Sequence, residues 1–226
     1  MGAPETTPPL GKAEPQPVQI TIPDASVAEN AALVARLTDL INTVYTETEE
    51  GLFAPSYRRT SRDEVRQLLL RRELALAYLS RVSPSHSDTS PATTTTSTTS
   101  PNPPFTDTDT DTLVIGCIRI HSLSPTHGDF GMLACDAAYR GLGAGRALVR
   151  FAEAHCRAVL GKTAMQCELL VARAFEHPFK ARNQAWYERM GYRVVGRLDF
   201  AREYPDLAGH LVTEGELRVF EKALLP

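Results

Sequence analysis

A glycine-rich segment, "YRGLGAGRAL" at residues 139–148, has the composition needed to bind a phosphate group. Its three glycines carry no side chain, so backbone amides there can approach an anion closely. Arg140 and Arg146 add positive charge on either side. The pattern predicts a loop between a strand end and a helix N-terminus, where unpaired amides and the helix dipole favour an anion. We therefore expect a phosphate or pyrophosphate to bind here.

Other interpretations of this loop can be compared by the residue spacing that each motif requires. A plain strand-to-helix turn would need the glycines only for positive φ and close packing. A dinucleotide-binding fingerprint needs G-x-G-x-x-G, but after Gly141, Gly143 and Gly145 the last required position holds Arg146. A Walker phosphate loop needs G-x-x-x-x-G-K-[ST], which the segment lacks. Both nucleotide motifs fail, and phosphate binding at a strand-to-helix turn is the interpretation we adopt.

The segment from Arg140 to Gly145 fits the motif [QR]-x-x-G-x-[GA] letter by letter, and here the chain resembles the GNAT superfamily of acetyl-CoA-dependent N-acetyltransferases. The resemblance covers about residues 18–224, apart from a low-complexity insertion. Within it, "HPFKARNQAWYERMGY" at 177–192 is similar to the late helix of the family, ending in Tyr187-x-x-x-Gly191-Tyr192. Within the superfamily we place the sequence in a fungal-like branch.

The resemblance implies a mixed α/β GNAT fold, with about six to seven strands in a central sheet flanked by about four helices. It also implies acetyl-CoA as cosubstrate and no metal. In this family the strand before the loop separates from the next strand, and its backbone binds the pantetheine arm. The cofactor-binding residues carried over are Leu133, Ala134, Cys135, Arg140, Gly141, Leu142, Gly143, Ala144, Gly145, Arg146 and Asn183. Cys135 is expected to pack rather than to act as a nucleophile.

The late helix departs from the family pattern at one position. The family often has an asparagine seven residues before the tyrosine, but Lys180 stands there in this sequence. Asn183 lies only four residues before Tyr187. Either Asn183 or Lys180 could contact coenzyme A. As the alternative, Asn183 is a surface amide and Lys180 a solvated charge.

Acetylation of an amine requires a proton acceptor and a proton donor. A lysine-like amine has a pKa near 10, so a base must remove a proton before it attacks. A backbone N–H near residues 133–135 could stabilise the oxyanion that forms. The resemblance implies Tyr187 as the acid that protonates the departing thiolate. For the base we prefer Glu50, and the alternatives are Glu49, Asp136 and His121. His177, which precedes Pro178, is expected to be a local turn partner rather than a base.

The elements that position these residues follow from the spacing of hydrophobic residues. Strands are expected at 18–24, 74–82, 113–123, 130–136, 166–172, 192–200 and 216–224. Two helices are expected after capping boxes, Ser26 with Glu29 and Ser61 with Glu64, and two more at about 145–160 and 179–190. The polar composition of residues 1–16 predicts a disordered tail, and that of residues 83–112 predicts a disordered insertion within a domain at 17–226.

Composition restricts the partners and the compartment. A net charge of −3 and a pI near 6.1 provide no basic field for nucleic acid. The four cysteines form no C-x-x-C pair, which indicates reduced thiols rather than a zinc site. We expect no signal peptide, no membrane helix, and a location in the cytosol or nucleus. Residues 1–6 also fit the short N-myristoylation pattern at Gly2, a weak signal.

The expected function is transfer of acetyl from acetyl-CoA to a primary amine, on a small molecule or a peptide, by direct attack in a ternary complex. The acidic segment "ETEE" at 47–50 suggests a cationic amine. A non-catalytic acyl-CoA-binding or interaction protein on the same fold is the alternative, and a nucleotide-dependent oxidoreductase is a third. The sequence determines neither the acceptor nor the oligomeric state.

Overall fold

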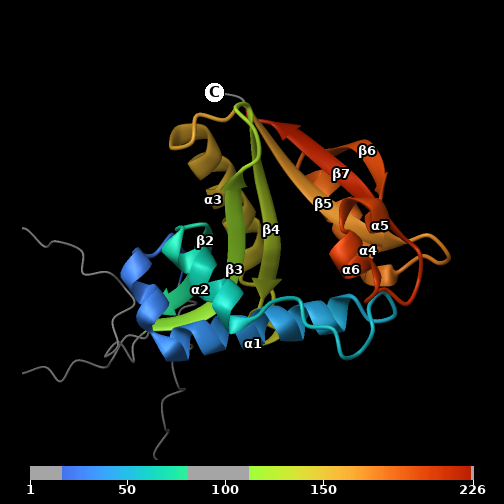
Figure 1. The fold of residues 1–226 in the computed structure, drawn as a ribbon. Coiled ribbons are helices and arrows are strands. Elements are labelled where there is room, and N and C mark those ends of the chain that lie inside the picture. The colour runs from blue at the N-terminus through green and yellow to red at the C-terminus, as the bar shows by residue number, and fades with distance from the viewer. Residues whose placement is uncertain (1–16, 81–111, 225–226) are drawn as a thin grey trace, which may run out of the picture.

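The fold is built on one mixed sheet. The computed structural model describes residues 17–80 and 112–224. Its strands are β1 (Gln19–Thr21), β2 (Leu74–Ser80), β3 (Thr112–Ser122), β4 (His127–Cys135), β5 (Ala164–Ala172), β6 (Arg193–Asp199) and β7 (Gly215–Ala223). They lie in the order β1-β2-β3-β4-β5-β7-β6, and only β4 and β5 are parallel neighbours. The sheet confirms the predicted mixed α/β architecture (Figure 1).

Helices cover both faces of this sheet. The longer ones are α1 (Ala31–Thr48), α2 (Arg62–Leu70), α3 (Ala144–Ala158) and α4 (Pro178–Arg189), and the short α5 (Phe200–Glu203) and α6 (Pro205–Ala208) connect β6 to β7. Leu37 of α1 and Leu69 of α2 belong to the core on one face. Leu148 of α3 and Tyr187 of α4 belong to the core on the other. In the described part of the chain, the helices are too short or too polar to cross a bilayer.

The first long helix begins later than predicted. The capping box of Ser26 with Glu29 is wrong, because these residues lie in a short 3-10 helix (Ala25–Glu29). Asp24 caps that turn, and its side chain accepts the backbone N–H of Ser26 at 3.0 Å. The cap of α1 is Asn30, whose side chain accepts the N–H of Leu33 at 2.9 Å. Asparagine is as good an N-cap as serine, and here it is the residue with extended backbone angles.

The second predicted capping box is half confirmed. Ser61 Oγ accepts the backbone N–H of Glu64 at 3.1 Å and caps α2. The Glu64 carboxylate bonds elsewhere, since it accepts a hydrogen bond from the Thr60 hydroxyl at 2.8 Å. The start of α2 is therefore fixed from both sides by Thr60 and Ser61.

The parallel strands β4 and β5 stay together only briefly. They pair at three positions, from His127 with Ala164 to Asp129 with Gln166. Beyond Asp129 they diverge, and Figure 1 shows β4 in yellow-green and β5 in orange spreading apart toward α1. We call residues 130–135 of β4 and 167–172 of β5 the fork. Within it, β4 has no strand partner on the side of β5 among the described residues.

A bulge shapes the β4 side of the fork. On β3, Cys117 pairs with Ala134 while Arg119 pairs with Gly131, so two residues of β4 lie opposite one of β3. One of these, Met132, has a φ of 49°, an uncommon value for a residue with a side chain. Such bulges bend a strand and increase its local twist. The bulge therefore lies where β4 turns away from β5.

Two predicted segments lie outside the described residues, the tail at 1–16 and the insertion at 83–112 except Thr112, which begins β3. The strands on either side of the insertion, β2 and β3, pair from Leu74 with Arg119 to Ser80 with Thr112. The chain therefore leaves and re-enters the sheet at neighbouring positions. The predicted domain limits stay predictions.

Candidate active site

The glycine loop lies where β4 ends and α3 begins. Gly141 has a φ of 90°, and Gly143, the N-cap of α3, has a φ of 76°. Both values lie in the left-handed region that glycine adopts without strain. No described heavy atom lies within 4 Å of a Cβ built on either residue. The loop is thus a tight turn whose outer side is open to a ligand.

The N-terminus of α3 can bind an anion. Its cap, Gly143, offers no side-chain hydrogen bond, so first-turn amides lack a side-chain acceptor. Arg140 and Arg146 are both exposed beside it. The preceding turn is held by Asp136, which accepts the N–H of Ala138 and pairs with Arg36, each at 3.0 Å. Asp136 is therefore a structural residue of the loop rather than a base.

The strand residues predicted to contact the cofactor, Leu133, Ala134 and Cys135, lie on the β4 side of the fork. Ala134 is fully buried, and the other two are half-buried. Burial raises the pKa of Cys135 to about 11, so this cysteine is a thiol at neutral pH. That state suits packing, as expected from the sequence, because the nucleophilic form of cysteine is the thiolate.

Tyr187 is buried beside the fork. Its ring centroid lies 5.9 Å from that of Phe130 on β4 and 5.5 Å from that of Phe220 on β7. Burial raises the pKa of Tyr187 well above its ordinary value, and Cys167 and Tyr45 act in the same direction. The phenol therefore keeps its proton at neutral pH, the state that a proton donor requires.

Lys180 is neither a solvated charge nor free to reach a phosphate. It is 5% exposed, and its Nζ lies 2.6 Å from Oε1 of the equally buried Glu49. The expectation of a surface charge was wrong because Glu49, distant in sequence, lies opposite Lys180 in the fold. Asn183, one turn further along α4, is half-buried, and its contact with coenzyme A stays a prediction.

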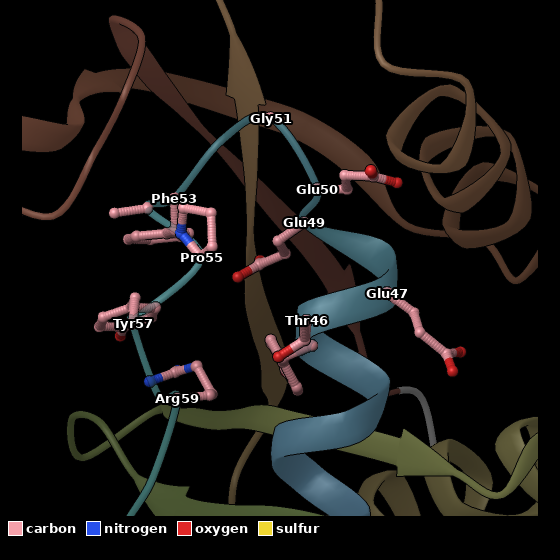
Figure 2. Close-up of a pocket in the computed structure, with 11 residues that line it drawn as sticks. Thr46, Glu47, Glu49, Glu50, Gly51, Phe53, Pro55, Tyr57 and Arg59 are labelled. Atoms are coloured by element: carbon pink, nitrogen blue, oxygen red, sulfur yellow. The ribbon is translucent and has the colours of Figure 1, made fainter.

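The acidic segment after α1 borders a pocket of about 340 Å³, lined by residues between Tyr45 and Arg59. Figure 2 shows the Glu49 side chain directed into this pocket and those of Glu47 and Glu50 directed away from it. Glu50 is exposed. The structure thus does not direct the predicted base, Glu50, toward the pocket, and its catalytic role stays a prediction.

His177 has the local role expected for it. As the N-cap of α4, its Nδ1 accepts the backbone N–H of Phe179 at 3.2 Å. The proton must then be on Nε2, which donates to the backbone carbonyl of Glu50 at 3.1 Å. His177 therefore ties the start of α4 to the loop after α1.

Asp129 is the carboxylate that sequence reasoning missed. It is the last residue of β4 paired with β5, and its Oδ2 lies 3.5 Å from Nδ1 of His121. Burial raises the pKa of Asp129 to about 6; Glu168 raises it further, while His121 and Arg119 lower it. The predicted strand began one residue later, at Phe130, so this acid lay outside every predicted element. The signal that could have identified it is the presence of one acidic residue in a strand whose burial alternates along the chain.

Tyr204 packs against Phe200, with ring centroids 5.4 Å apart, and Phe200 in turn packs against Phe53 of the pocket at 5.9 Å. The Tyr204 hydroxyl donates to Oε2 of Glu168 at 2.6 Å. Burial raises the pKa of Tyr204, as do Glu168 and Asp129, whereas Arg59 lowers it. The phenol therefore keeps its proton at neutral pH and donates it to Glu168. Among the described residues, no group of three or more His, Cys, Asp and Glu side chains could hold a metal.

Comparisons with known proteins agree with this geometry. Residues 107–194 match the family described as acetyltransferase (GNAT) domain, which is under half of the chain. No curated protein matches the sequence. The matched range contains the glycine loop, β4, β5 and Tyr187.

Solved structures resemble most of the chain at low sequence identity. An aminoglycoside 6'-N-acetyltransferase complexed with coenzyme A shares 16% identity with a TM-score of 0.51, over 86% of this chain and 92% of that one. A Salmonella typhimurium protein with its cofactor acetyl-CoA shares 12% sequence identity with a TM-score of 0.53, over 92% of this chain and 94% of that one. N-acetylglutamate synthase from Neisseria gonorrhoeae, complexed with coenzyme A and N-acetyl-glutamate, shares 12% sequence identity with a TM-score of 0.52. The match covers 95% of this chain but 37% of that one. The chain thus has the GNAT fold, with a GNAT acetyltransferase domain match at residues 107–194.

Proposed function

We propose that this protein transfers an acetyl group from acetyl-CoA to a primary amine. The observation that carries the proposal is the fork, which opens at Asp129 and has the glycine loop at the end of its β4 arm and Tyr187 beside it. Coenzyme A or acetyl-CoA in the solved structures of similar fold supports it. The fungal-like branch and the location in cytosol or nucleus stay predictions from the sequence.

The residues of the fork and loop fit coenzyme A. On the side of β5, residues 130–135 of β4 have no strand partner in the described chain, so their backbone can bond the amides of a pantetheine arm. The open loop with Arg140 and Arg146 fits the pyrophosphate. Acetyl-CoA supplies the thioester, and the chain supplies position, an oxyanion-binding amide near residues 133–135, and proton transfer.

The two proton-transfer groups approach the fork from opposite faces of the sheet. Phe130 belongs to the core on the α3 and α4 face, where Tyr187 packs against it. Successive residues of a strand point to opposite faces, so Asp129 points to the face covered by α1. An amine arriving from the α1 side would therefore meet the base, Asp129, while the departing thiol meets the acid, Tyr187.

The pH dependence follows from Asp129. A base must be unprotonated, and the pKa of Asp129 is raised to about 6, so kcat/KM should fall about tenfold per pH unit below pH 6. We expect Asp129→Asn to abolish this acid limb and to lower kcat/KM about 100-fold, which is within the usual contribution of a general base. Asp206→Asn, at an exposed aspartate, is the control. If the acid limb of the kcat/KM profile is unchanged in Asp129→Asn, the general base is not Asp129. Glu50 is then the candidate base, and Glu50→Gln tests it.

Alanine substitutions at two glycines distinguish a role of the loop in cofactor binding from the cost of backbone strain alone. Gly143 and Gly161 have φ values of 76° and 65°, and neither has a described heavy atom within 4 Å of a built Cβ. Alanine at either should cost about 1 kcal/mol of stability. Only Gly143→Ala should also raise the KM for acetyl-CoA, by about tenfold, since Gly161 lies at the other end of α3. Equal KM values in the two variants would contradict a phosphate at the loop.

The direct test is release of thiol from acetyl-CoA with a panel of amines, peptides and polyamines, with the acetylated products identified by mass spectrometry. Acetyl-CoA-dependent N-acetylation of any amine class above the amine-free rate supports the proposal. Saturable binding of acetyl-CoA without thiol release across the panel would favour a non-catalytic acyl-CoA-binding protein instead.

A further inference from the structure

The pocket after α1 contains an arginine, Arg59, in a lining that the sequence suggests to be acidic. Of the glutamates after Tyr45, Figure 2 shows only Glu49 directed into the pocket. Lys180 neutralises it at 2.6 Å. Arg59 lines the pocket as well, and no carboxylate of the described residues lies within ion-pair distance of it. Glu47 and Glu50 also line the pocket, but their side chains are directed away from it. Arg59 is therefore the charged side chain of the pocket that is available to a ligand.

Arg59 is framed by two tyrosines. Its guanidinium carbon lies 5.2 Å from the ring centroid of Tyr45, and Tyr57 also lines the pocket. Burial raises the pKa of both phenols, that of Tyr45 to about 12, so both keep their protons although Arg59 lowers these values. Burial disfavours the charge of Arg59, but Tyr45, Glu49 and Tyr57 raise its pKa above the ordinary value. A guanidinium beside two hydroxyl donors is chemistry that binds a carboxylate.

The pocket wall is held in place by segments distant in sequence. Phe53 and Tyr57 stack with ring centroids 4.3 Å apart. The N–H of Ala54 donates to the carbonyl of His210 at 2.8 Å, and the N–H of Val212 donates to that of Leu52 at 2.9 Å. A wall fixed in this way loses little freedom when a ligand binds.

The pocket is also connected to the fork. Phe53, which lines the pocket, has its ring centroid 5.9 Å from that of Phe200, and the Phe200 ring lies 5.4 Å from that of Tyr204. The Tyr204 hydroxyl itself bonds to Glu168 at 2.6 Å. A ligand lying between these groups would face a positive side chain at the Arg59 end and negative side chains at the end near β4 and β5.

We propose that the acceptor is an amine that also carries a carboxylate. The carboxylate binds Arg59 with the hydroxyls of Tyr45 and Tyr57, and the ammonium lies at Asp129 and Glu168. A single guanidinium favours a monoanion over a phosphate dianion, because the glutamates that line the pocket would repel a second negative charge. This inference rests on the proposed acetyl transfer, and it replaces the purely cationic amine suggested by "ETEE".

The test compares acceptors that differ in one group. Amino acids of increasing length, from glycine to 6-aminohexanoate, are assayed beside their carboxamides and beside phosphoethanolamine. We expect kcat/KM for a carboxylate of fitting length to exceed that for its carboxamide by about 10- to 100-fold. Arg59→Gln should remove this preference, and Tyr57→Phe should reduce it a few-fold. Arg62→Gln, at an exposed arginine of α2 near the pocket, should keep it.

Each outcome decides a separate question. Equal rates for carboxylates and carboxamides, or a preference for phosphoethanolamine, overturn the carboxylate site and leave acetyl transfer standing. If no acceptor is acetylated, titration calorimetry still measures whether the same amino acids bind at the Arg59 site. Binding that Arg59→Gln abolishes, in a variant with an unchanged melting curve, upholds the carboxylate site and overturns the enzyme. No binding overturns both.

Discussion

Tyr187→Phe is expected to lower kcat about 1,000-fold with little change in the KM for acetyl-CoA. The ring, which packs against Phe130 and Phe220, is kept, and only the proton donor is lost. Burial raises the pKa of this phenol, so thiolate departure can take a proton from it even in alkaline buffer. The wild-type kcat should therefore show no decline up to about pH 10, measured by thiol release.

Tyr192→Phe is the matched control. Tyr192, like Tyr187, is a buried residue of the α4-side core, but its hydroxyl donates to Oε1 of Glu153 at 2.8 Å. Loss of that bond should cost about 1 kcal/mol of stability, with Glu153 still paired to Lys222 at 2.9 Å, and leave kcat near the wild-type value. Equal kcat values for Tyr187→Phe and the wild type would remove Tyr187 from the mechanism.

Lys180→Met is expected to destabilise the fold by about 3–5 kcal/mol, measured by denaturant unfolding. The substitution leaves the Glu49 carboxylate buried without its partner at 2.6 Å. The double variant Glu49→Gln with Lys180→Met should regain most of this loss, because apolar or neutral groups can replace a buried pair at little cost.

An exposed ion pair provides the comparison. Arg197 lies 3.4 Å from Glu216, with its side chain 62% exposed. Arg197→Gln should change stability by less than about 1 kcal/mol, since solvent screens such pairs. Losses of similar size in Lys180→Met and Arg197→Gln would contradict a buried, interdependent pair at Glu49.

The parts of the fold that sequence reasoning predicted depend on local signals. Hydrophobic alternation located the strands, glycine spacing located the loop before α3, and Ser61 was read correctly as a cap. Asn30 was missed because Ser26 offers the same chemistry nearby, and the choice between them depends on backbone angles. Local hydrogen bonding can therefore be inferred to within a turn of helix.

The site depended on contacts that no local pattern contains. Glu49 and Lys180 are 131 residues apart. Whether Glu49 or Glu50 enters the pocket depends on where α1 ends, because one residue rotates a helical side chain by about 100°. The raised pKa of Asp129 comes from burial and from Glu168 on another strand. Orientation and desolvation, rather than residue type, separate Glu50, the base predicted from the sequence, from Asp129, the base that we propose.

The brief pairing of β4 with β5 makes the sheet two half-sheets joined along a seam of three residue pairs. The backbone groups of β4 beyond the seam lack the neighbour that a continuous sheet would supply. On the proposed function, the arm of acetyl-CoA takes the place of that missing strand. The cosubstrate is then a structural part of the folded state, and its concentration sets how firmly the two halves are held together.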